Sequence, residues 1–184
     1  MPLTRSEQMS RIRGKNTQPE LRLRRALWSA GLRYRLHHRT PAGRPDVVFP
    51  GRKVAVFIDG CFWHGCPLHY VRPGTREAFW AEKLKANVDR DRRQTLALEE
   101  AGWRVVRLWE HAVFEELEAC VARVRLAVEG EDWAPEPAYR VVRVDVVDPG
   151  SRIERRILET LRDASQGREE MGPRVTAKWR RPKG

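Results

Sequence analysis

Two cysteines, two histidines and two large aromatic residues crowd into the short stretch from 59 to 69, DGCFWHGCPLH. Soft sulfur and borderline nitrogen donors at this spacing suit a zinc ion. Cys61, Cys66 and His69 offer three ligands, and His111, which follows a later apolar run, offers a fourth. Two cysteines and two histidines would close a tetrahedral site. The sequence therefore predicts a structural zinc centre.

His64 in the same stretch is open to two roles. It could replace His111 as the fourth zinc ligand, or it could act as a general acid or base, since imidazole exchanges protons near neutral pH. The simpler alternative is that the whole stretch is an ordinary loop that binds no metal.

Four acidic residues stand where solvent-exposed charges are not expected: Glu20, Asp46, Asp59 and Asp91. Asp59 ends an apolar run, and Asp91 shares a predicted helical face with Val88. A buried carboxylate needs a hydrogen bond, a counter-charge or a metal, because burying it alone is costly. Together these oxygen donors favour a Mg²⁺ site at one end of a sheet, as in a nuclease.

Three of these carboxylates also have simpler explanations. Glu20 could only complete the capping box of a helix that begins at Thr17. Asp46 could cap the turn after Pro45, and Asp91 could pair with a neighbouring arginine, Arg90 or Arg92.

Phe62, Trp63 and Trp80 form the third group of interest. Aromatic residues usually pack in a core, but Phe62 and Trp63 lie in a glycine-flanked loop. We expect at least two of the three rings to face solvent or DNA, where an aromatic side chain can wedge between bases.

The composition favours a nucleic acid as the partner. The chain has 184 residues with 36 Lys+Arg against 25 Asp+Glu, so its formal net charge of +11 favours phosphate backbones. Basic residues in the N-terminal arm and in a long helix are expected to hold phosphates: Arg11, Arg13, Lys15, Arg90, Arg92 and Arg93. The alternative is that the charge serves solubility alone.

The compartment is expected to be reducing. An odd, low count of three cysteines argues against a disulfide framework. No signal peptide or membrane-spanning run is evident. We therefore expect a cytoplasmic protein that is associated with the nucleoid and does not contact a membrane.

The element order predicts an α/β fold with a mixed β-sheet flanked by helices. Helices are expected over 17–30, 76–101 and 113–128, and strands over 32–36, 46–49, 54–58 and 103–109. Cys120 is expected to pack in the core.

Four segments divide the chain. A basic arm (1–16) precedes an endonuclease-like domain (17–128), a linker (129–138) and an extension of unknown role (139–184). In the extension we expect a strand over 139–147, a helix over 151–163 with a Ser-x-x-Glu capping box, and a basic, disordered tail from 165.

Residues 5–112 closely resemble the very short patch repair (Vsr) endonucleases, which nick DNA at mismatches. The matching segments are collinear: RSEQMSRIRGKNTQPELRLRRALW, GLRYRLH, GRPDVVFP, VAVFIDGCFWHGCPLHY, FWAEKLKANVDRDRRQ and GWRVVRLWEH. The resemblance implies a restriction-endonuclease-like fold and a nick 5′ to the thymine of a T:G mismatch. It also implies a double-stranded DNA substrate and mismatch-repair proteins as partners. We expect a monomer.

The resemblance also implies roles for single residues. Asp46 and the carbonyl of Ile58 would hold Mg²⁺, His64 would be the catalytic histidine, and Asp91 its carboxylate partner. Glu20 matches a further acidic residue of the site. The zinc ligands would fall at or beside Cys61, Cys66, His69 and His111. The wedging residues would be Phe62, Trp63 and Trp80 from one groove and Met9 from the other.

Three departures from the family pattern stand out. Asp59 occupies the place of a second active-site histidine and could bind metal directly. His69 and His111 replace cysteines, an exchange that zinc tolerates. The spacing to His69 differs by one residue from that pattern.

Overall fold

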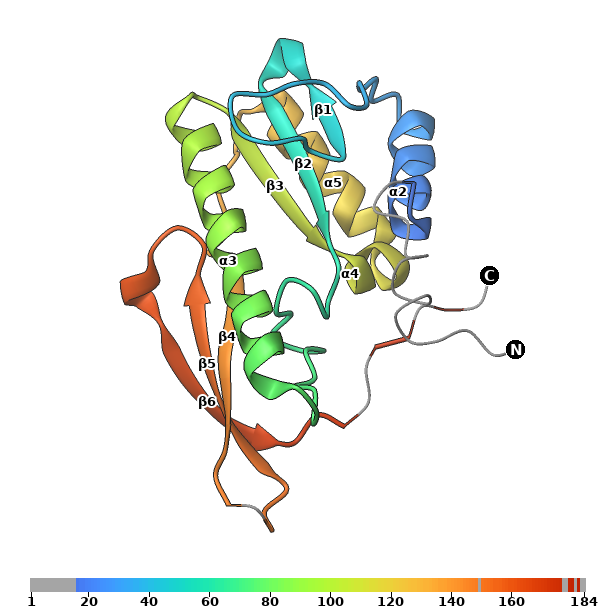
Figure 1. Cartoon of the computed structure of the whole chain (residues 1–184). Helices are drawn as coiled ribbons and strands as arrows, with labels where there is room; N and C mark the ends of the chain where they lie inside the picture. Colours follow the sequence, from blue (N-terminus) through green and yellow to red (C-terminus); the bar gives the residue numbers. More distant parts are fainter. Residues whose placement is uncertain (1–15, 149, 177–178, 181, 183–184) are drawn as a thin grey trace, which may run out of the picture.

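The structure, a computed structural model, describes residues 16–148, 150–176, 179–180 and 182. The predictions for Met9, Arg11, Arg13 and Lys15 fall outside these residues. The described residues form two three-stranded sheets with a long helix between them (Figure 1).

The first sheet is mixed, as predicted. Strands β1 (Val47–Phe49) and β2 (Val54–Asp59) form an antiparallel hairpin around the short helix η1 (Pro50–Arg52). Strand β3 (Arg104–Trp109) lies parallel to β2, so the strand order is β1-β2-β3.

The strand expected over 32–36 does not form. Arg35 makes only an isolated bridge to Val48. The backbone turns away soon afterwards, since His37 has a positive φ of 54°. Without extended residues on both sides of the bridge, a strand cannot propagate.

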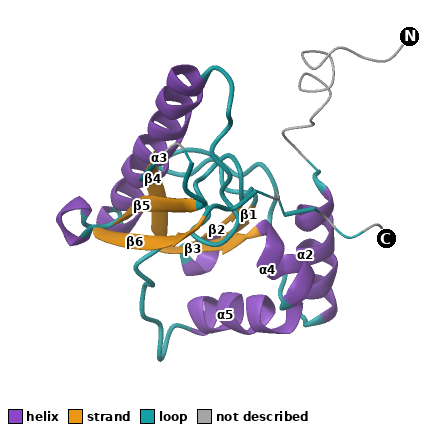
Figure 2. Ribbon diagram, turned by 90° about the horizontal axis from the view of Figure 1, so that it is seen from below, coloured by secondary structure: helices purple, strands orange, loops and turns teal. Residues whose placement is uncertain are grey.

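Both faces of the first sheet are covered by helices (Figure 2). Val54 and Val56 of β2 pack with the helices α2 (Gln18–Ser29), α4 (Glu110–Glu115) and α5 (Leu117–Glu129). Ala55 and Phe57 point to the other face, where Leu98 of α3 (Glu77–Glu100) joins them. This alternation follows from the two-residue period of a strand.

The helix expected over 113–128 is two helices. Glu116, with a φ of −135°, lies outside the helical range and separates α4 from α5. Cys120 is buried in the core of this face, as predicted.

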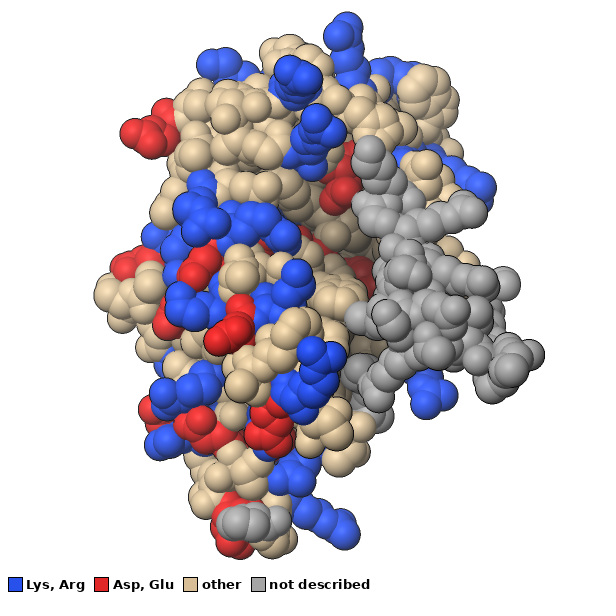
Figure 3. All heavy atoms as spheres, in the orientation of Figure 1, with Lys and Arg blue, Asp and Glu red and all other residues tan. Residues whose placement is uncertain are grey.

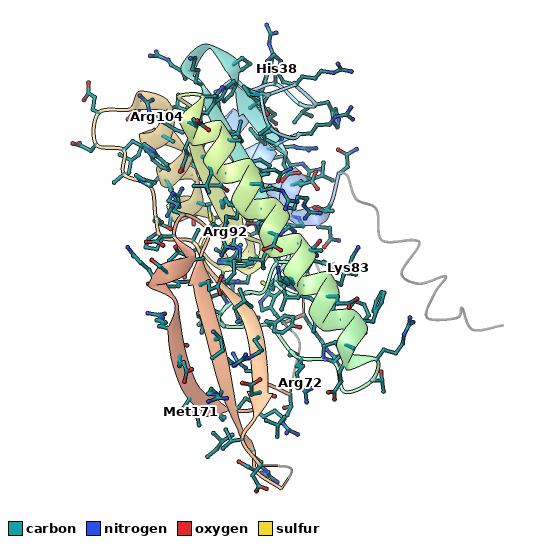
Figure 4. The ribbon with its side chains drawn as sticks, turned by 60° about the vertical axis from the view of Figure 1, so that its left-hand side comes forward. His38, Arg72, Lys83, Arg92, Arg104 and Met171 are labelled. Carbon is teal, nitrogen blue, oxygen red and sulfur yellow. The ribbon has the colours of Figure 1, made fainter. Side chains whose placement is uncertain are left out.

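The second sheet is formed by β4 (Tyr139–Val146), β5 (Ile153–Thr160) and β6 (Arg168–Pro173), all antiparallel. It packs on the first half of α3, where Val141 and Leu158 contact Leu84 and Val88. Figure 4 shows Arg92 on the sheet side of α3, where the guanidinium binds Glu159 and the carbonyl of Thr160.

Two expectations for the C-terminal extension were wrong. Residues 153–160 form strand β5 rather than a helix, because pairing with β4 and β6 outweighs the local capping signal. The Ser151 hydroxyl instead accepts a hydrogen bond from the Ile153 N–H at 3.0 Å, before the strand. Residues 168–173, expected to be disordered, form the edge strand β6. The strand expected from Tyr139 is confirmed as β4.

Among the described residues, no helix has the length and apolar character needed to cross a membrane.

Candidate active site and metal centre

The candidate site lies where the parallel strands β2 and β3 end side by side. Asp59, the last residue of β2, is in register with Trp109, the last residue of β3. A cavity of about 540 Å³ opens at this point, and its lining includes Glu20, Asp46, Asp59, His64 and Asp91. Figure 3 shows acidic atoms in the depth of a hollow beside α3, with basic side chains on the surface around it. The structure thus brings together carboxylates from distant parts of the sequence.

Asp46 lies directly before β1, beside the end of β2. Its Oδ2 accepts the N–H of Ile58 at 2.8 Å, so the partner of this carboxylate is the neighbouring strand rather than the turn after Pro45. Burial raises the pKa of Asp46 to about 6, reinforced by the charges of Glu20 and Asp59 and opposed by the Ile58 N–H. A carboxylate in this environment is suited to a divalent cation.

Glu20 lines the cavity and is held at the start of α2 without forming a capping box, because the Thr17 side chain accepts no backbone N–H there. Its carboxylate accepts the Asn16 N–H at 3.0 Å and the Thr17 hydroxyl at 2.9 Å. It also forms a 2.8 Å ion pair with Arg24, one turn further along α2. These three contacts hold the carboxylate in place, but they are not those of the capping box that the sequence offered as the simpler explanation.

Asp59 is fully engaged by arginines. Arg107 of β3 binds it through two nitrogens, at 2.8 and 2.9 Å, and Arg140 of β4 donates to Oδ2 at 2.5 Å. Burial would raise the pKa of Asp59, but the positive charges of Arg107 and Arg140, together with His64, lower it well below its usual range. This geometry argues against Asp59 as a direct metal ligand, because both oxygens already bind cations.

Asp91 and His64 form a close pair. The Nδ1 of His64 lies 2.5 Å from Oδ2 of Asp91 and 3.5 Å from Oδ1 of Asp59. The other oxygen of Asp91 binds Arg107 at 3.1 Å, whereas Arg90 is 3.5 Å away. We name Asp59, His64, Asp91 and Arg107 the acidic cluster. The pairing of Asp91 with Arg92 does not occur, since Arg92 turns to the second sheet.

Arg107, Arg140 and Glu110 belong to the site but were missed in the sequence. Glu110 accepts the Cys61 N–H at 2.8 Å and lines the cavity. The sequence held a signal for Arg107, because a basic residue within the apolar run of β3 indicates a buried charge that needs a partner. The sequence held no such signal for Arg140, because the position of its side chain depends on how the second sheet packs.

The second group of donors, the Cys/His cluster, consists of Cys61, Cys66, His69 and His111. One donor atom from each lies within 4.8 Å of all the others. Sulfur-to-nitrogen distances are 3.2 Å from Cys61 to His111 and 3.7 Å from Cys66 to each histidine. Tetrahedral zinc with ordinary bond lengths would separate sulfur and nitrogen ligands by about 3.5 Å. The donor set therefore fits a zinc ion.

His64 takes no part in the Cys/His cluster, because its Nδ1 faces Asp91. Of the two fourth ligands considered, the geometry thus selects His111. Hydrogen bonds from Cys61 and His111 lower the pKa of Cys66 against the effect of burial, which favours one thiolate in the cluster.

The aromatic cluster of Phe62, Trp63 and Trp80 lies next to both groups. All three side chains are half-buried, and their ring centroids lie 5.2 to 6.0 Å apart. Phe79, 45% exposed and 5.2 Å from Trp80, extends the cluster and was missed in the sequence. Asn87 of α3 donates to the Trp63 carbonyl at 2.8 Å and so holds the loop against the helix.

Comparisons with known proteins identify similar sequences among DNA endonucleases. The family model described as "DNA mismatch endonuclease Vsr" matches residues 1–69. A type II nicking enzyme, V.NaeI of Lentzea aerocolonigenes, is 50% identical over 65% of this chain and 74% of its own length. The chain belongs to the Vsr endonuclease family. The DNA mismatch endonuclease Vsr of Escherichia coli (strain K12) is 44% identical over 60% of this chain and 71% of its own length.

Among solved structures, the catalytic domain of the homing endonuclease I-Bth0305I covers 64% of this chain and 100% of that domain. The TM-score of this match is 0.46 and its sequence identity is 18%.

Proposed function

We propose that this member of the Vsr family is a Mg²⁺-dependent, zinc-stabilised endonuclease that nicks one DNA strand 5′ to the thymine of a T:G mismatch. The observation that carries the proposal is the convergence of Asp46, His64 and Asp91 on one cavity beside the aromatic cluster. A protein that only binds DNA has no use for inward carboxylates, because they repel phosphate.

The carboxylate of Asp46 and the carbonyl of Ile58 would hold the Mg²⁺ ion, with the scissile phosphate completing its ligands. When bound, the ion would stabilise charge on the phosphate oxygens and lower the pKa of a bound water. The Ile58 N–H fixes one oxygen of Asp46 and leaves the other for this contact.

His64 would serve as the proton acceptor. Its Nδ1 is held by Asp91, which leaves Nε2, on the far side of the ring, to take a proton from the attacking water. As the water oxygen bonds to phosphorus, the P–O bond to the leaving sugar oxygen breaks, and that oxygen takes up a proton from solvent water. Asp91, itself fixed by Arg107, keeps the imidazole in one orientation.

The surface around the cavity would bind the duplex. Arg44 and Arg90 line the cavity and would contact phosphates. The aromatic cluster would wedge between base pairs at the mismatch, where unstacking is easier than in a matched duplex. The Cys/His cluster would fix the loop that carries Phe62 and Trp63.

The test is a nicking assay with two labelled duplexes that differ only in one T:G mismatch, each incubated with protein and Mg²⁺. A nick confined to the mismatched duplex supports the proposal. Equal nicking of both duplexes would instead support a related endonuclease with another specificity. Binding without any nicking would support a zinc-containing DNA-binding module. Mismatch-repair protein partners, a monomeric state and a cytoplasmic location stay predictions.

A further inference from the structure

Arg140 of the second sheet is buried against Asp59 of the candidate active site. It is 1% exposed, its Nη2 donates to Oδ2 of Asp59 at 2.5 Å, and its guanidinium stacks over the ring of Trp109 at 4.1 Å. Its Nη1 donates to the carbonyl of Tyr139. The strand β4 thus places the positive charge of Arg140 beside the last residues of β2 and β3.

A buried guanidinium is unfavourable unless a carboxylate and further hydrogen bonds compensate for its lost hydration. Asp59 supplies that carboxylate, but the Nε of Arg140 has no hydrogen-bond partner within the described part of the chain. Packing alone would be served better by an apolar side chain at this position. The arrangement therefore points to a role for the charge itself.

The charge acts on His64 through Asp59. Asp59 has one oxygen shared by Arg107 and Arg140, and its other oxygen lies between Arg107 and the imidazole of His64. Arg107 in turn reaches Asp91, the close partner of His64. Without Arg140, Asp59 would keep one cation in place of two and would be freer to turn toward His64.

The same strand also holds the loop that carries His64. The N–H of Val141 donates to the carbonyl of Gly65 at 2.8 Å. Gly65 has a φ of +68°, and a Cβ there would lie 2.5 Å from the Val141 carbonyl, so only glycine allows this approach. From β5, Arg156 donates to the carbonyl of Pro67 at 3.0 Å.

We propose that Arg140 is a positioning residue of the nicking site, which fixes Asp59 and through it His64, so that the C-terminal sheet is part of the catalytic centre. The inference rests on the proposed nicking function. It predicts that the charge of Arg140 affects the rate of the chemical step far more than it affects DNA binding.

The test compares Arg140→Met, which keeps the bulk and removes the charge, with Arg140→Lys, which keeps the charge. The control is Arg143→Met on the same strand, because Arg143 is exposed and forms an ion pair, at 3.2 Å, with Asp145 of β4. Each full-length variant is measured for its single-turnover nicking rate, its Kd for uncleaved mismatched duplex without Mg²⁺, and its melting temperature.

We expect Arg140→Met to lower the single-turnover rate by about 10- to 100-fold, while Kd changes by less than about threefold. Arg140→Lys should recover most of that loss, and Arg143→Met should behave like the unsubstituted protein. In a double-mutant cycle with Asp59→Asn, Arg140→Met should cause little further loss, because the two residues act as a unit.

Nicking by Arg140→Met at the rate of the control would overturn the proposal. If Arg140→Met does not fold, Arg140→Gln replaces it. A folded Gln variant with an undiminished rate, or losses of rate that always match losses of folded protein, would also overturn it. Failure of the unsubstituted protein to nick any duplex counts against the proposed function instead, so the two failures are distinguishable.

Discussion

The acidic cluster and the Cys/His cluster share the loop from 60 to 66, which carries His64 of the first and Cys61 and Cys66 of the second, and they balance their charges differently. In the acidic cluster the protein supplies the cations, since Arg107 and Arg140 neutralise Asp59 and Arg107 also binds Asp91. In the Cys/His cluster the donors face one another at distances typical of ligands around one ion.

The comparison indicates which donors suit each of the two proposed metal ions. A zinc ion fits the Cys/His cluster, because its donors converge without an intervening cation. A magnesium ion fits Asp46 rather than Asp59, because Asp46 has an N–H partner and a raised pKa, whereas Asp59 is already paired with two guanidinium groups.

The largest expected effect is on the nicking rate, when the carboxylate of Asp46 is removed. Asp46→Asn is expected to lower the nicking rate by about 10³-fold or more, because it removes the ionised ligand that would hold Mg²⁺. Its Kd for mismatched duplex should stay within about threefold of the unsubstituted value, since the phosphate contacts remain. Single-turnover assays and anisotropy titrations measure the two quantities. Retention of nicking would move the magnesium site elsewhere, with Asp59 as the first candidate.

The second prediction concerns the Cys/His cluster. Cys66→Ser is expected to lose bound zinc and to lower the free energy of unfolding by about 3 kcal/mol or more, because zinc binding contributes to folding. Elemental analysis and urea unfolding measure both effects. The matched control is Cys120→Ala, which should keep its zinc and cost about 1 kcal/mol of packing. Equal zinc content in the two variants would contradict the ligand assignment.

A smaller effect should appear in stability against pH. The pKa of Asp46 in the folded protein, about 6, lies above the ordinary value of 3.8, so the native state binds the proton more tightly. Stability from this group is therefore lost as pH rises from about 4 to about 6. In buffer without Mg²⁺ but with zinc retained, Asp46→Asn should be more stable than the unsubstituted protein by about 1–2 kcal/mol near pH 8.

The same two proteins should converge in stability near pH 4, where Asp46 is protonated in the native state. Urea unfolding across this pH range measures the difference. A stability difference that does not vary with pH would show that burial does not destabilise the ionised form of Asp46. Asp46 would then have no special need of a bound cation.

The smallest predicted effect tests the aromatic cluster. Trp80→Ala should weaken binding to mismatched duplex by about 10-fold, as expected when one stacking ring is removed. Trp28→Ala is the control, because Trp28 is 54% exposed on α2 and packs against Tyr34, outside the cluster. Anisotropy titrations give both affinities. Equal affinities would assign the aromatic cluster to packing alone.

Much of the first sheet and of the donor sets could be predicted from the sequence. The apolar run of β2 and the turn after Phe49 specify a hairpin through local patterns. Asp91 could be placed on the buried face of α3 because a helix has a fixed period, and it is 1% exposed. The candidate zinc ligands could be named from the sequence because donor type and spacing restrict the choices, although His64 and His111 stayed as alternatives for the fourth ligand.

The tertiary structure alone decided which side chains meet across the second sheet. The capping signal at Ser151 predicted a helix, yet residues 153–160 pair on both sides with strands from other parts of the chain. Strand pairing depends on such distant partners, so a local pattern cannot specify it.

The same dependence on distant partners explains why the roles of Arg107 and Arg140 could not be predicted from the sequence. The residue types at 107 and 140 are evident in the sequence, but which carboxylate each one binds depends on the packing of β4 against the ends of β2 and β3. The sequence by itself determined the kinds of donor at this site and the elements that carry them. The folded chain decided which of those donors are neutralised by the protein's own cations and which are left for a metal, because ion pairing at 2.5 to 3.1 Å requires contacts between residues far apart in the chain.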